Sequence, residues 1–477
     1  MQKTDFYIDG AWVQPARSHL YDIVSPSDGT ISATISLGSA DDVDRAVGAA
    51  RRAFEDWSQT DFRRRVGLLE RLQQIYAARS EEMAQAISLE MGAPITFARQ
   101  SQADAGRSQI SNFLAAAKEY QFEHAMRADG SGDQILHEPI GVCGLITPWN
   151  WPINQIALKV VPALLAGCTV VLKPSEIAPL SAMLFAEMID EAGYPAGVFN
   201  LVNGDGATVG EAISGHPGID MVSFTGSTRA GVAVMKRAAE TVKRVTLELG
   251  GKSPNVVFAD VDVEETITRG ARACFSNAGQ SCNAPTRMLV ERPIYEKAVA
   301  IAVKVANDLA VGAPNAEGPH IGPVISMRQF DKIQTLIQAG IAEGARLAAG
   351  GPGRPEGLAA GAYVRPTVFA DVDNGMTIAR EEIFGPVLCI IPFDSEGEAI
   401  RIANDTPYGL NAQVQSKDLA RARRVARAIR SGMVQINGAS RASGSPFGGV
   451  KQSGNGREGG IWGIEEYLET KSVSGWG

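Results

Sequence analysis

Short apolar runs that alternate with helical segments are the feature of this sequence that most restricts its fold. Five such runs lie at residues 140–147, 169–173, 199–202, 221–225 and 244–249. Short strands separated by helical or glycine-rich segments are typical of βαβ units. We therefore expect a parallel sheet with helical cover, and we expect ligands beyond the carboxyl ends of its strands.

A second set of strand-like runs follows Lys252. These runs lie at residues 255–258, 287–291, 364–369, 387–393 and 433–436, with helical patterns at 295–309, 328–343 and 419–429. A chain of 477 residues is also too long for one compact core. The sequence predicts an α/β protein with two doubly wound domains.

The first quarter of the chain is mostly helical in pattern. Residues 6–13 predict a β-hairpin around Asp9-Gly10, and a helix begins near Asp41 with Ser39 as its cap. Further helical regions are expected at 62–91 and 95–120. A strand-like run at 467–473 lies in the tail, and we expect a partner subunit to complete it.

Composition excludes several classes of function. A net charge of -8 argues against nucleic acid or an anionic membrane as the main partner. The arginines at 63–65 and 421–430 are interpreted as solvated helix faces. The five cysteines form no CxxC pair, which predicts neither a disulfide framework nor a metal site. Without an apolar leader or spanning segment, we expect a cytoplasmic location.

Glu248 and Cys282 are the first candidates for chemistry. Glu248 ends an apolar run, and Cys282 closes the turn Gly279-Gln-Ser-Cys282. A thiol is strongly nucleophilic even when little of it is ionised, and a nearby carboxylate can act as a base in a two-step covalent reaction. The alternative for Cys282 is a small buried hydrophobic residue.

The turns after the strands hold further candidates, each with a structural alternative. Gly226-Ser-Thr-Arg-Ala-Gly231 could bind a phosphate or form an ordinary βα turn. Lys173 with Glu176 could bind a ribose or form a surface ion pair. Asn150 could donate to an oxyanion or be a satisfied turn residue. Gly250-Gly-Lys-Ser253 lacks the earlier glycine of a Walker A loop, because Thr246 stands there.

Seven motifs occur in the order and at the spacing of one family. They are Thr147-Pro-Trp-Asn150, Lys173-Pro-Ser-Glu176, Phe224-Thr-Gly-Ser227, Glu248-Leu-Gly-Gly-Lys-Ser253, Gly279-Gln-Ser-Cys282, Glu382-Ile-Phe-Gly-Pro386 and Pro446-Phe-Gly-Gly449. Together they closely resemble the NAD(P)-dependent aldehyde dehydrogenase superfamily over essentially the whole chain, and its hydrolytic, non-acylating branch in particular.

The resemblance implies a mechanism in which Cys282 attacks an aldehyde. Asn150 would hold the oxyanion of the thiohemiacetal, and Glu248 would activate the water that hydrolyses the thioester. A proton path would use Lys159 and Glu458. The presence of Glu248 disfavours the alternative, a CoA-acylating aldehyde dehydrogenase. A fold that has lost its activity is a further alternative, which the three catalytic side chains argue against.

The resemblance also implies a cofactor site. NAD is preferred over NADP because a carboxylate at Glu176 would repel a 2′-phosphate. Residues implied at the cofactor are Ile146, Thr147, Trp149, Lys173, Ser175, Glu176, Phe224, Gly226, Ser227, Leu249, Gln329, Glu382 and Phe384.

The same resemblance supplies a substrate pocket and a domain scheme. The residues implied around the aldehyde are Trp151, Gln155, Leu158, Ser276, Ser281, Asn283 and Phe447. Several of these are polar, which mildly favours an oxygenated aldehyde, and Arg441 nearby could meet an anionic tail or face solvent. The NAD-binding, Rossmann-like domain is expected at 1–118 and 140–249, and the catalytic domain at 250–448. A small β oligomerisation element at 119–139 and 449–477 would form a homodimer or homotetramer.

Overall fold

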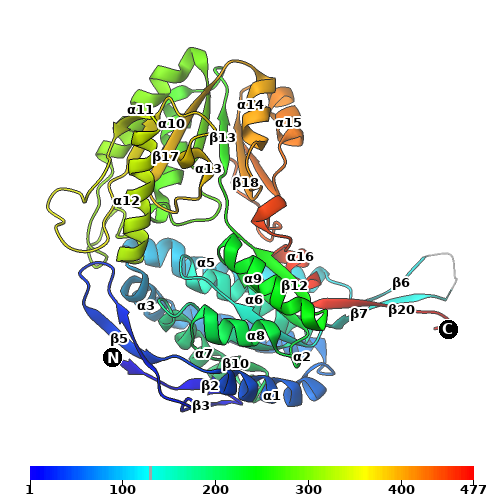
Figure 1. Cartoon of the computed structure of the whole chain (residues 1–477). Coiled ribbons are helices and arrows are strands. Elements are labelled where there is room, and N and C mark those ends of the chain that lie inside the picture. The colour runs from blue at the N-terminus through cyan, green and yellow to red at the C-terminus, as the bar shows by residue number, and fades with distance from the viewer. Residues whose placement is uncertain (128–131, 477) are drawn as a thin grey trace.

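Two seven-stranded sheets form the protein in the computed structural model, which describes residues 1–127 and 132–476 (Figure 1). The first sheet has the order β12-β11-β8-β9-β10-β2-β3. Its strands are β2 (Phe6–Ile8), β3 (Ala11–Val13), β8 (Val142–Ile146), β9 (Thr169–Lys173), β10 (Phe199–Leu201), β11 (Met221–Thr225) and β12 (Arg244–Glu248). Strands β8 to β12 pair in parallel, and the hairpin β2-β3 adds an antiparallel edge.

Helices cover both faces of the first sheet, because its central strands are apolar on both sides. One face carries α1 (Ala40–Trp57), α8 (Glu211–Gly215) and α9 (Thr228–Ala238). The other carries α2 (Phe62–Ala78), α3 (Ser80–Met91), α5 (Asp104–Glu119), α6 (Pro152–Ala166), α7 (Leu180–Ala192) and α16 (Gly460–Glu465).

The second sheet has the order β15-β16-β17-β14-β13-β18-β19. Its strands are β13 (Pro254–Val257), β14 (Arg287–Glu291), β15 (Arg346–Ala349), β16 (Thr367–Ala370), β17 (Val387–Phe393), β18 (Asn411–Gln415) and β19 (Met433–Ile436). Helices α10 (Val263–Phe275) and α11 (Tyr295–Asp308) pack on one face, and α12 (Met327–Ala342), α13 (Thr377–Arg380), α14 (Glu396–Asn404) and α15 (Leu419–Ala428) belong to the other. The predicted doubly wound α/β fold is confirmed.

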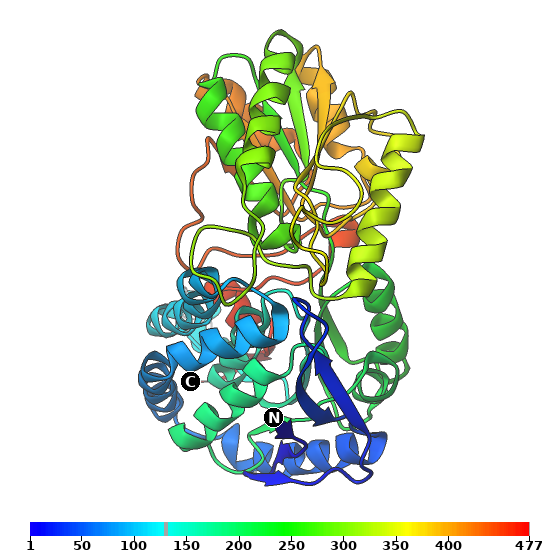
Figure 2. The same cartoon turned by 90° about the vertical axis from the view of Figure 1, so that its left-hand side faces the viewer.

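A third, N-terminal sheet was not predicted. It consists of β1 (Gln2–Lys3), β5 (Ile31–Ser36) and β4 (Leu20–Val24), in that order. In Figure 2 the turn between β4 and β5 rises from the lower half toward the upper one. There the amide of Ala362 donates to the carbonyl of Pro26 at 2.8 Å. This turn is one of the contacts between the two halves.

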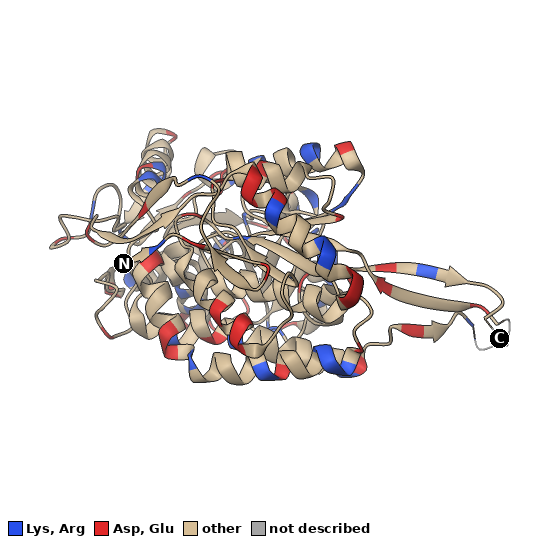
Figure 3. Cartoon of the chain, turned by 90° about the horizontal axis from the view of Figure 1, so that it is seen from below, with Lys and Arg blue, Asp and Glu red and all other residues tan. Residues whose placement is uncertain are grey.

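A three-stranded antiparallel sheet extends from the side of the first half (Figures 1 and 3). Its order is β20 (Leu468–Val473), β7 (Gln134–Pro139) and β6 (Glu123–Ala125). The predicted tail strand is β20, which pairs along its whole length with β7 of the same chain, and its completion by a partner subunit stays a prediction. Residues 128–131 and 477, which belong to the expected oligomerisation element, lie outside the described residues.

Two local predictions differ from the structure. The expected helix at 95–120 contains a π-helix, η1 (Ala98–Ala103), between α4 (Ile95–Phe97) and α5. The interpretation of residues 63–65 as a solvated face is wrong for Arg65, which is buried and donates to the carbonyl of Ala166 at 3.2 Å. None of the helices within residues 1–127 and 132–476 is long and apolar enough to cross a membrane.

Glu90 on α3 caps the start of α7 from outside that helix. Its carboxylate accepts from the backbone amides of Leu180 and Ser181, and Pro179 provides no side-chain cap of its own. Removal from water raises the pKa of Glu90 from 4.5 to about 7, although these amides lower it in part. Burial therefore keeps this carboxyl partly neutral near pH 7.

Replacing Glu90 by Gln should remove a pH-dependent part of the stability. A carboxyl whose pKa rises on folding stabilises the fold below its unfolded pKa, and this contribution is lost as the pH rises through the folded pKa. Between pH 5 and pH 8 the free energy of unfolding of the wild type should fall by roughly 3 kcal/mol more than that of Glu90→Gln. Chemical denaturation at both pH values measures this difference. Equal pH dependence of the two proteins would contradict it, and Glu119→Gln, on the exposed side of α5, is the control.

Candidate active site

Asn150 lies in the turn between β8 and α6, beyond the carboxyl end of a central strand of the first sheet. Trp151 precedes the first turn of α6 and Pro152 starts it, which fixes where the turn ends. The side chain of Asn150 is buried, and its Nδ2 donates to the carbonyl of Gln280 at 3.0 Å. Since an amide carries two N–H groups, a second one remains for another acceptor.

Glu248 is the last residue of β12, next to β11 at the edge of the same sheet. Its side chain is buried, and neither carboxylate oxygen has a hydrogen-bond partner among the described residues. Burial and the nearby Glu458 hold the pKa of Glu248 well above its usual range, while Lys159 and Arg457 act in the opposite direction. A carboxyl with a raised pKa is suited to accept a proton near neutral pH.

The glycines around Glu248 allow a close approach of the backbone. A Cβ at Gly448 would lie 2.8 Å from Oε1 of Glu248, and Gly448 has a φ of +155°. A Cβ at Gly251 would lie 2.4 Å from the carbonyl oxygen of Cys282. Gly448 and Gly251, which belong to two predicted motifs, thus have no room for a side chain beside Glu248 and Cys282.

Cys282 belongs to the second half of the chain and follows the short helix η4 (Ser276–Gly279). It is partly accessible, whereas Cys143, Cys168, Cys274 and Cys389 are buried. Removal from water raises the pKa of Cys282, and the carboxylates of Glu382, Glu248 and Glu458 raise it further. Burial and the three carboxyl groups thus act together against ionisation of the thiol.

Lys159 and Glu458 form a buried ion pair next to Glu248. The Nζ of Lys159 lies 2.7 Å from Glu458 Oε1 and donates to Ser223 Oγ at 2.9 Å. Glu458 is fixed by two backbone hydrogen bonds of 2.7 Å with Phe447. These two groups were predicted as a proton path, and they lie beside the carboxylate that such a path would serve.

The predicted adenosine site lies at the ends of β9 and β10. The Nζ of Lys173 donates to the carbonyls of Pro174 and Gly204, and lies 3.6 Å from Glu176. Ser227 caps α9, where its Oγ accepts from the amide of Ala230 at 3.3 Å. A lysine, a carboxylate and a free helix start suit the hydroxyls and phosphates of a dinucleotide.

The predicted nicotinamide site joins the two halves. Trp149 and Phe384 meet edge to face with centroids 5.4 Å apart. Gln329 donates to the carbonyls of Ile383 and Phe384, and Glu382 accepts from the amide of Gly251 at 2.9 Å. Of the other predicted cofactor residues, Ile146, Phe224 and Leu249 pack in the core beneath α9, Thr147 and Ser175 are buried in their turns, and Gly226 leads into α9.

The predicted substrate residues lie around the Cys282 loop. Trp151 Nε1 donates to Ser281 Oγ at 2.8 Å, and Phe97 meets the Trp151 ring at 5.7 Å. The backbone carbonyl of Asn283 accepts a hydrogen bond from Nδ2 of Asn411 at 3.2 Å. The guanidinium of Arg441 lies over the Phe447 ring, 5.1 Å from its centroid.

Two predicted substrate residues lie deeper. Gln155 is buried, and Leu158 lines a small space shared with Glu248 and Glu458. Leu158 therefore lies beside the predicted base, Glu248, rather than in the outer part of the predicted substrate pocket.

Sequence reasoning missed a set of buried amides behind Asn150. Gln102 on η1 and Asn277 in η4 both contact the backbone carbonyl of Asn150. A single glutamine inside a helical pattern gives no signal, and only Gln280 belonged to a recognised motif. Within residues 1–127 and 132–476, no group of His, Cys, Asp or Glu side chains could hold a metal ion.

Comparison with known proteins shows the family of this chain. The model of the "Aldehyde dehydrogenase family" matches residues 12–473. A 3-succinoylsemialdehyde-pyridine dehydrogenase from a Pseudomonas species is 52% identical, with coverage of 99% of this chain and 98% of that protein. This chain belongs to the aldehyde dehydrogenase family, and the resemblance predicted from its motifs is confirmed.

Solved structures agree as well. An aldehyde dehydrogenase from Bartonella henselae has a TM-score of 0.98 at 55% identity, with coverage of 99% of both chains. Aldehyde dehydrogenase C from Pseudomonas syringae, in a cysteine-to-alanine variant with NAD+ and octanal, has a TM-score of 0.97 at 51% identity, with 99% of this chain and 97% of that chain covered.

The Lys159 and Glu458 pair should respond asymmetrically to mutation. Lys159→Met leaves the Glu458 carboxylate buried without a counter-charge, so we expect a loss of about 3–5 kcal/mol in the free energy of unfolding. Lys159→Met combined with Glu458→Gln should recover much of that loss. Chemical denaturation measures both. Lys304→Met breaks the exposed pair with Asp308 and serves as control, with an expected change below about 0.5 kcal/mol. A small loss in Lys159→Met alone would contradict the expectation.

Proposed function

We propose that this protein oxidises an aldehyde to its carboxylic acid while NAD+ is reduced, with Cys282 as nucleophile. Three neighbouring groups carry the proposal. The Cys282 thiol is partly accessible, and the buried Glu248 carboxyl raises its pKa. The side chain of Asn150 donates to the carbonyl of Gln280, in the loop that holds this thiol. Membership of the aldehyde dehydrogenase family supports it.

The first step joins the sulfur of Cys282 to the carbonyl carbon of the aldehyde. The partly accessible thiol gives up its proton to water, and the carbonyl oxygen becomes an oxyanion on a thiohemiacetal. The unused N–H of Asn150 and the backbone N–H of Cys282 donate to that oxyanion. Donors fixed in a water-poor site stabilise developing charge strongly, because they need no reorganisation during the reaction.

In the second step the thiohemiacetal carbon loses a hydride and becomes a thioester. NAD+, when bound, supplies the hydride acceptor. The residues of this chain that would hold it are Lys173 and Glu176 at the adenosine ribose, Ser227 at the pyrophosphate, and Glu382 with Phe384 at the nicotinamide ribose. The fit rests on the donor set, namely a lysine and a carboxylate beside a helix start, and on the glycines that keep the backbone close to Glu382.

The last step breaks the thioester with water. Glu248 takes a proton from the water as its oxygen attacks the acyl carbon, and the sulfur leaves to be protonated again. The products are a carboxylic acid and the free thiol. Glu458 and Lys159, which lie behind Glu248, offer the proton a route away from it.

The substrate is proposed only as a class. Polar side chains at Gln155, Ser276, Ser281 and Asn283 favour an aldehyde that carries oxygen or other hydrogen-bond acceptors. One relative is named for a semialdehyde bearing a pyridine, and another was solved with octanal. We also propose a homodimer or homotetramer, in which the outer edge of β20 is available to another subunit.

Glu248→Gln should separate the two halves of the reaction. Without the base the thioester accumulates, so we expect one NADH per active site in a burst and steady turnover reduced about 100-fold or more. Stopped-flow absorbance of NADH measures both. In the wild type, turnover should fall as the pH drops through the raised pKa of Glu248, above the usual range of a glutamate.

Two controls define the outcome of this experiment. Cys282→Ala should show no burst, and unchanged turnover in Glu248→Gln would remove Glu248 from its role. Faster product release on addition of CoA would instead favour an acylating dehydrogenase.

Glu176 should set the choice between the two dinucleotides. The 2′-phosphate of NADP would face this carboxylate, so the wild type should prefer NAD+ in kcat/KM. Glu176→Gln should reduce the ratio of kcat/KM for NAD+ to kcat/KM for NADP by about tenfold, mainly because the KM for NADP falls. Initial rates at varied concentrations of each dinucleotide measure this. A wild type that prefers NADP would refute the assignment.

A further inference from the structure

Three buried amide side chains meet where the two halves of the protein touch. Gln102 comes from the π-helix η1, whereas Asn277 and Gln280 come from the segment that leads to Cys282. Gln102 Nε2 donates to the carbonyl of Asn150 and to Asn277 Oδ1, both at 3.2 Å. The side chain of Gln102 is 0% exposed. Such a cluster is unusual in a core, because buried polar groups are stable only when they are paired.

The hydrogen bonds of this cluster form a closed ring around Asn150. Asn277 Nδ2 donates to the carbonyl of Asn150 at 3.0 Å and to the carbonyl of Gln280 at 3.1 Å. The side chain of Asn150 donates to the same Gln280 carbonyl. Each of these two carbonyls therefore accepts two hydrogen bonds and is saturated. Gln102 faces two acceptors, the carbonyl oxygen of Asn150 and Oδ1 of Asn277. Only the NH2 group of Gln102 can donate to them.

The segment that the ring holds is strained. Asn277 and Ala278 have φ values of +54° and +53°, in the left-handed region that residues with a Cβ avoid. Such conformations are unfavourable by about 1–3 kcal/mol each and persist only where the surroundings impose them. The strain lies four and five positions before Cys282 in the sequence.

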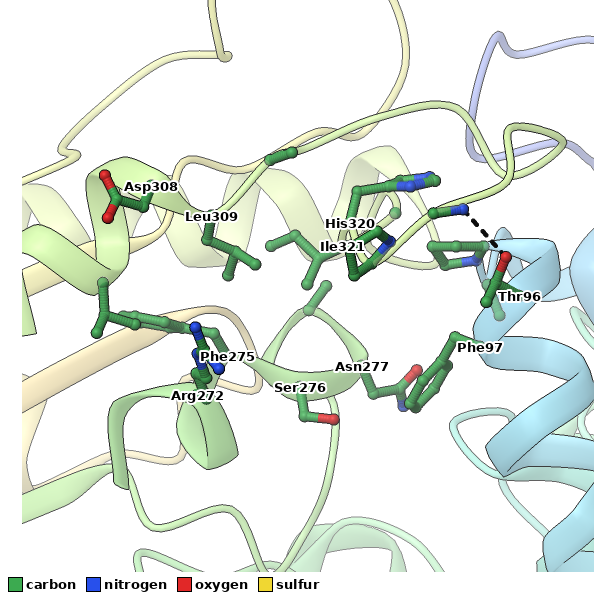
Figure 4. Close-up of a pocket in the computed structure, with 18 of the residues that line it drawn as sticks. Thr96, Phe97, Arg272, Phe275, Ser276, Asn277, Asp308, Leu309, His320 and Ile321 are labelled. Atoms are coloured by element: carbon green, nitrogen blue, oxygen red, sulfur yellow. Dashed lines mark hydrogen bonds between the residues drawn. The ribbon is translucent and has the colours of Figure 1, made fainter. Parts of the chain in front are cut away.

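Asn277 and Ala278 are buried, and Ala278 packs in the core of the second half. The rear of the segment faces a cavity of about 820 Å³ (Figure 4). Leu309, His320 and Ile321 line one side of that cavity, and Phe275, Ser276 and Asn277 line the other. Core packing and the hydrogen-bond ring therefore hold the segment together. Gln102 and Asn150 supply the parts of the ring that are anchored in the first half of the protein.

We infer that Gln102 is a positioning residue for the chemistry at Cys282. It holds Asn150 and Asn277 so that the free N–H of Asn150 points at the carbonyl oxygen under attack. Gln102 itself does not touch the aldehyde. The inference rests on the proposed roles of Cys282 and Asn150. According to this inference, Gln102 of the first half aligns the loop of the second half that leads to Cys282.

Gln102→Met tests the inference, because methionine keeps the length of the side chain and removes its donors. In the Glu248→Gln background, where the thioester accumulates, the rate constant of the NADH burst should fall about 10- to 100-fold, since a small displacement of a reacting group has an effect of this size. The burst amplitude should remain near one per folded site, and NAD+ binding should change less than about twofold. A merely structural role would lower the amplitude and the Tm but leave the rate constant unchanged.

Gln100→Met is the matched control, because Gln100 lies exposed on the same π-helix and lines the cavity. In the same background its burst should equal that of Glu248→Gln alone. If Gln102→Met does not fold, Gln102→Leu replaces it, since leucine also lacks both donors. A slower burst of full amplitude in either variant supports the inference, and an unchanged rate constant overturns it. A burst that survives in Cys282→Ala would instead refute the proposed function.

Discussion

The hydrogen bond from Asn150 to the carbonyl of Gln280 is the interaction on which the rest of the site depends. Asn150 follows a strand of the first sheet, and Gln280 lies two residues before the thiol of the second half. Neither half contains the proposed site by itself, because one carries Asn150 and the proposed base Glu248 and the other carries the proposed nucleophile Cys282. In the proposed mechanism the geometry of the reaction is therefore set at the contact between the two halves.

The charges around Cys282 constrain the site as strongly as its geometry does. Glu248, Glu382 and Glu458 all act against ionisation of the thiol, and the pair of Lys159 with Glu458 is buried beside them. Burial and these carboxyl groups together raise the pKa of the Cys282 thiol. The pKa values of Glu248 and Glu382 are raised as well, so burial disfavours negative charge throughout this part of the site.

The sequence predicted the architecture because its apolar runs are short and bounded by turn residues. Strands β8, β9, β11, β14 and β17 were all anticipated. Strand β18 was missed, since Asn411, Gln413 and Gln415 break the apolar pattern and are paired only in three dimensions, as Gln415 is with Asn255. Gln102 and Arg65 carried no signal for the same reason: their partners are distant carbonyl groups. The roles of the motif residues came from the family resemblance and stay predictions.

One consequence of the topology concerns the order in which the protein can assemble during synthesis. The core of the first half includes Ile464, Tyr467 and Leu468, which follow every strand of the second sheet in the chain. The core of the first half is therefore completed only by residues that the ribosome adds after the whole second sheet. Until those residues are made, the N-terminal strands and helices lack this last part of their apolar cover.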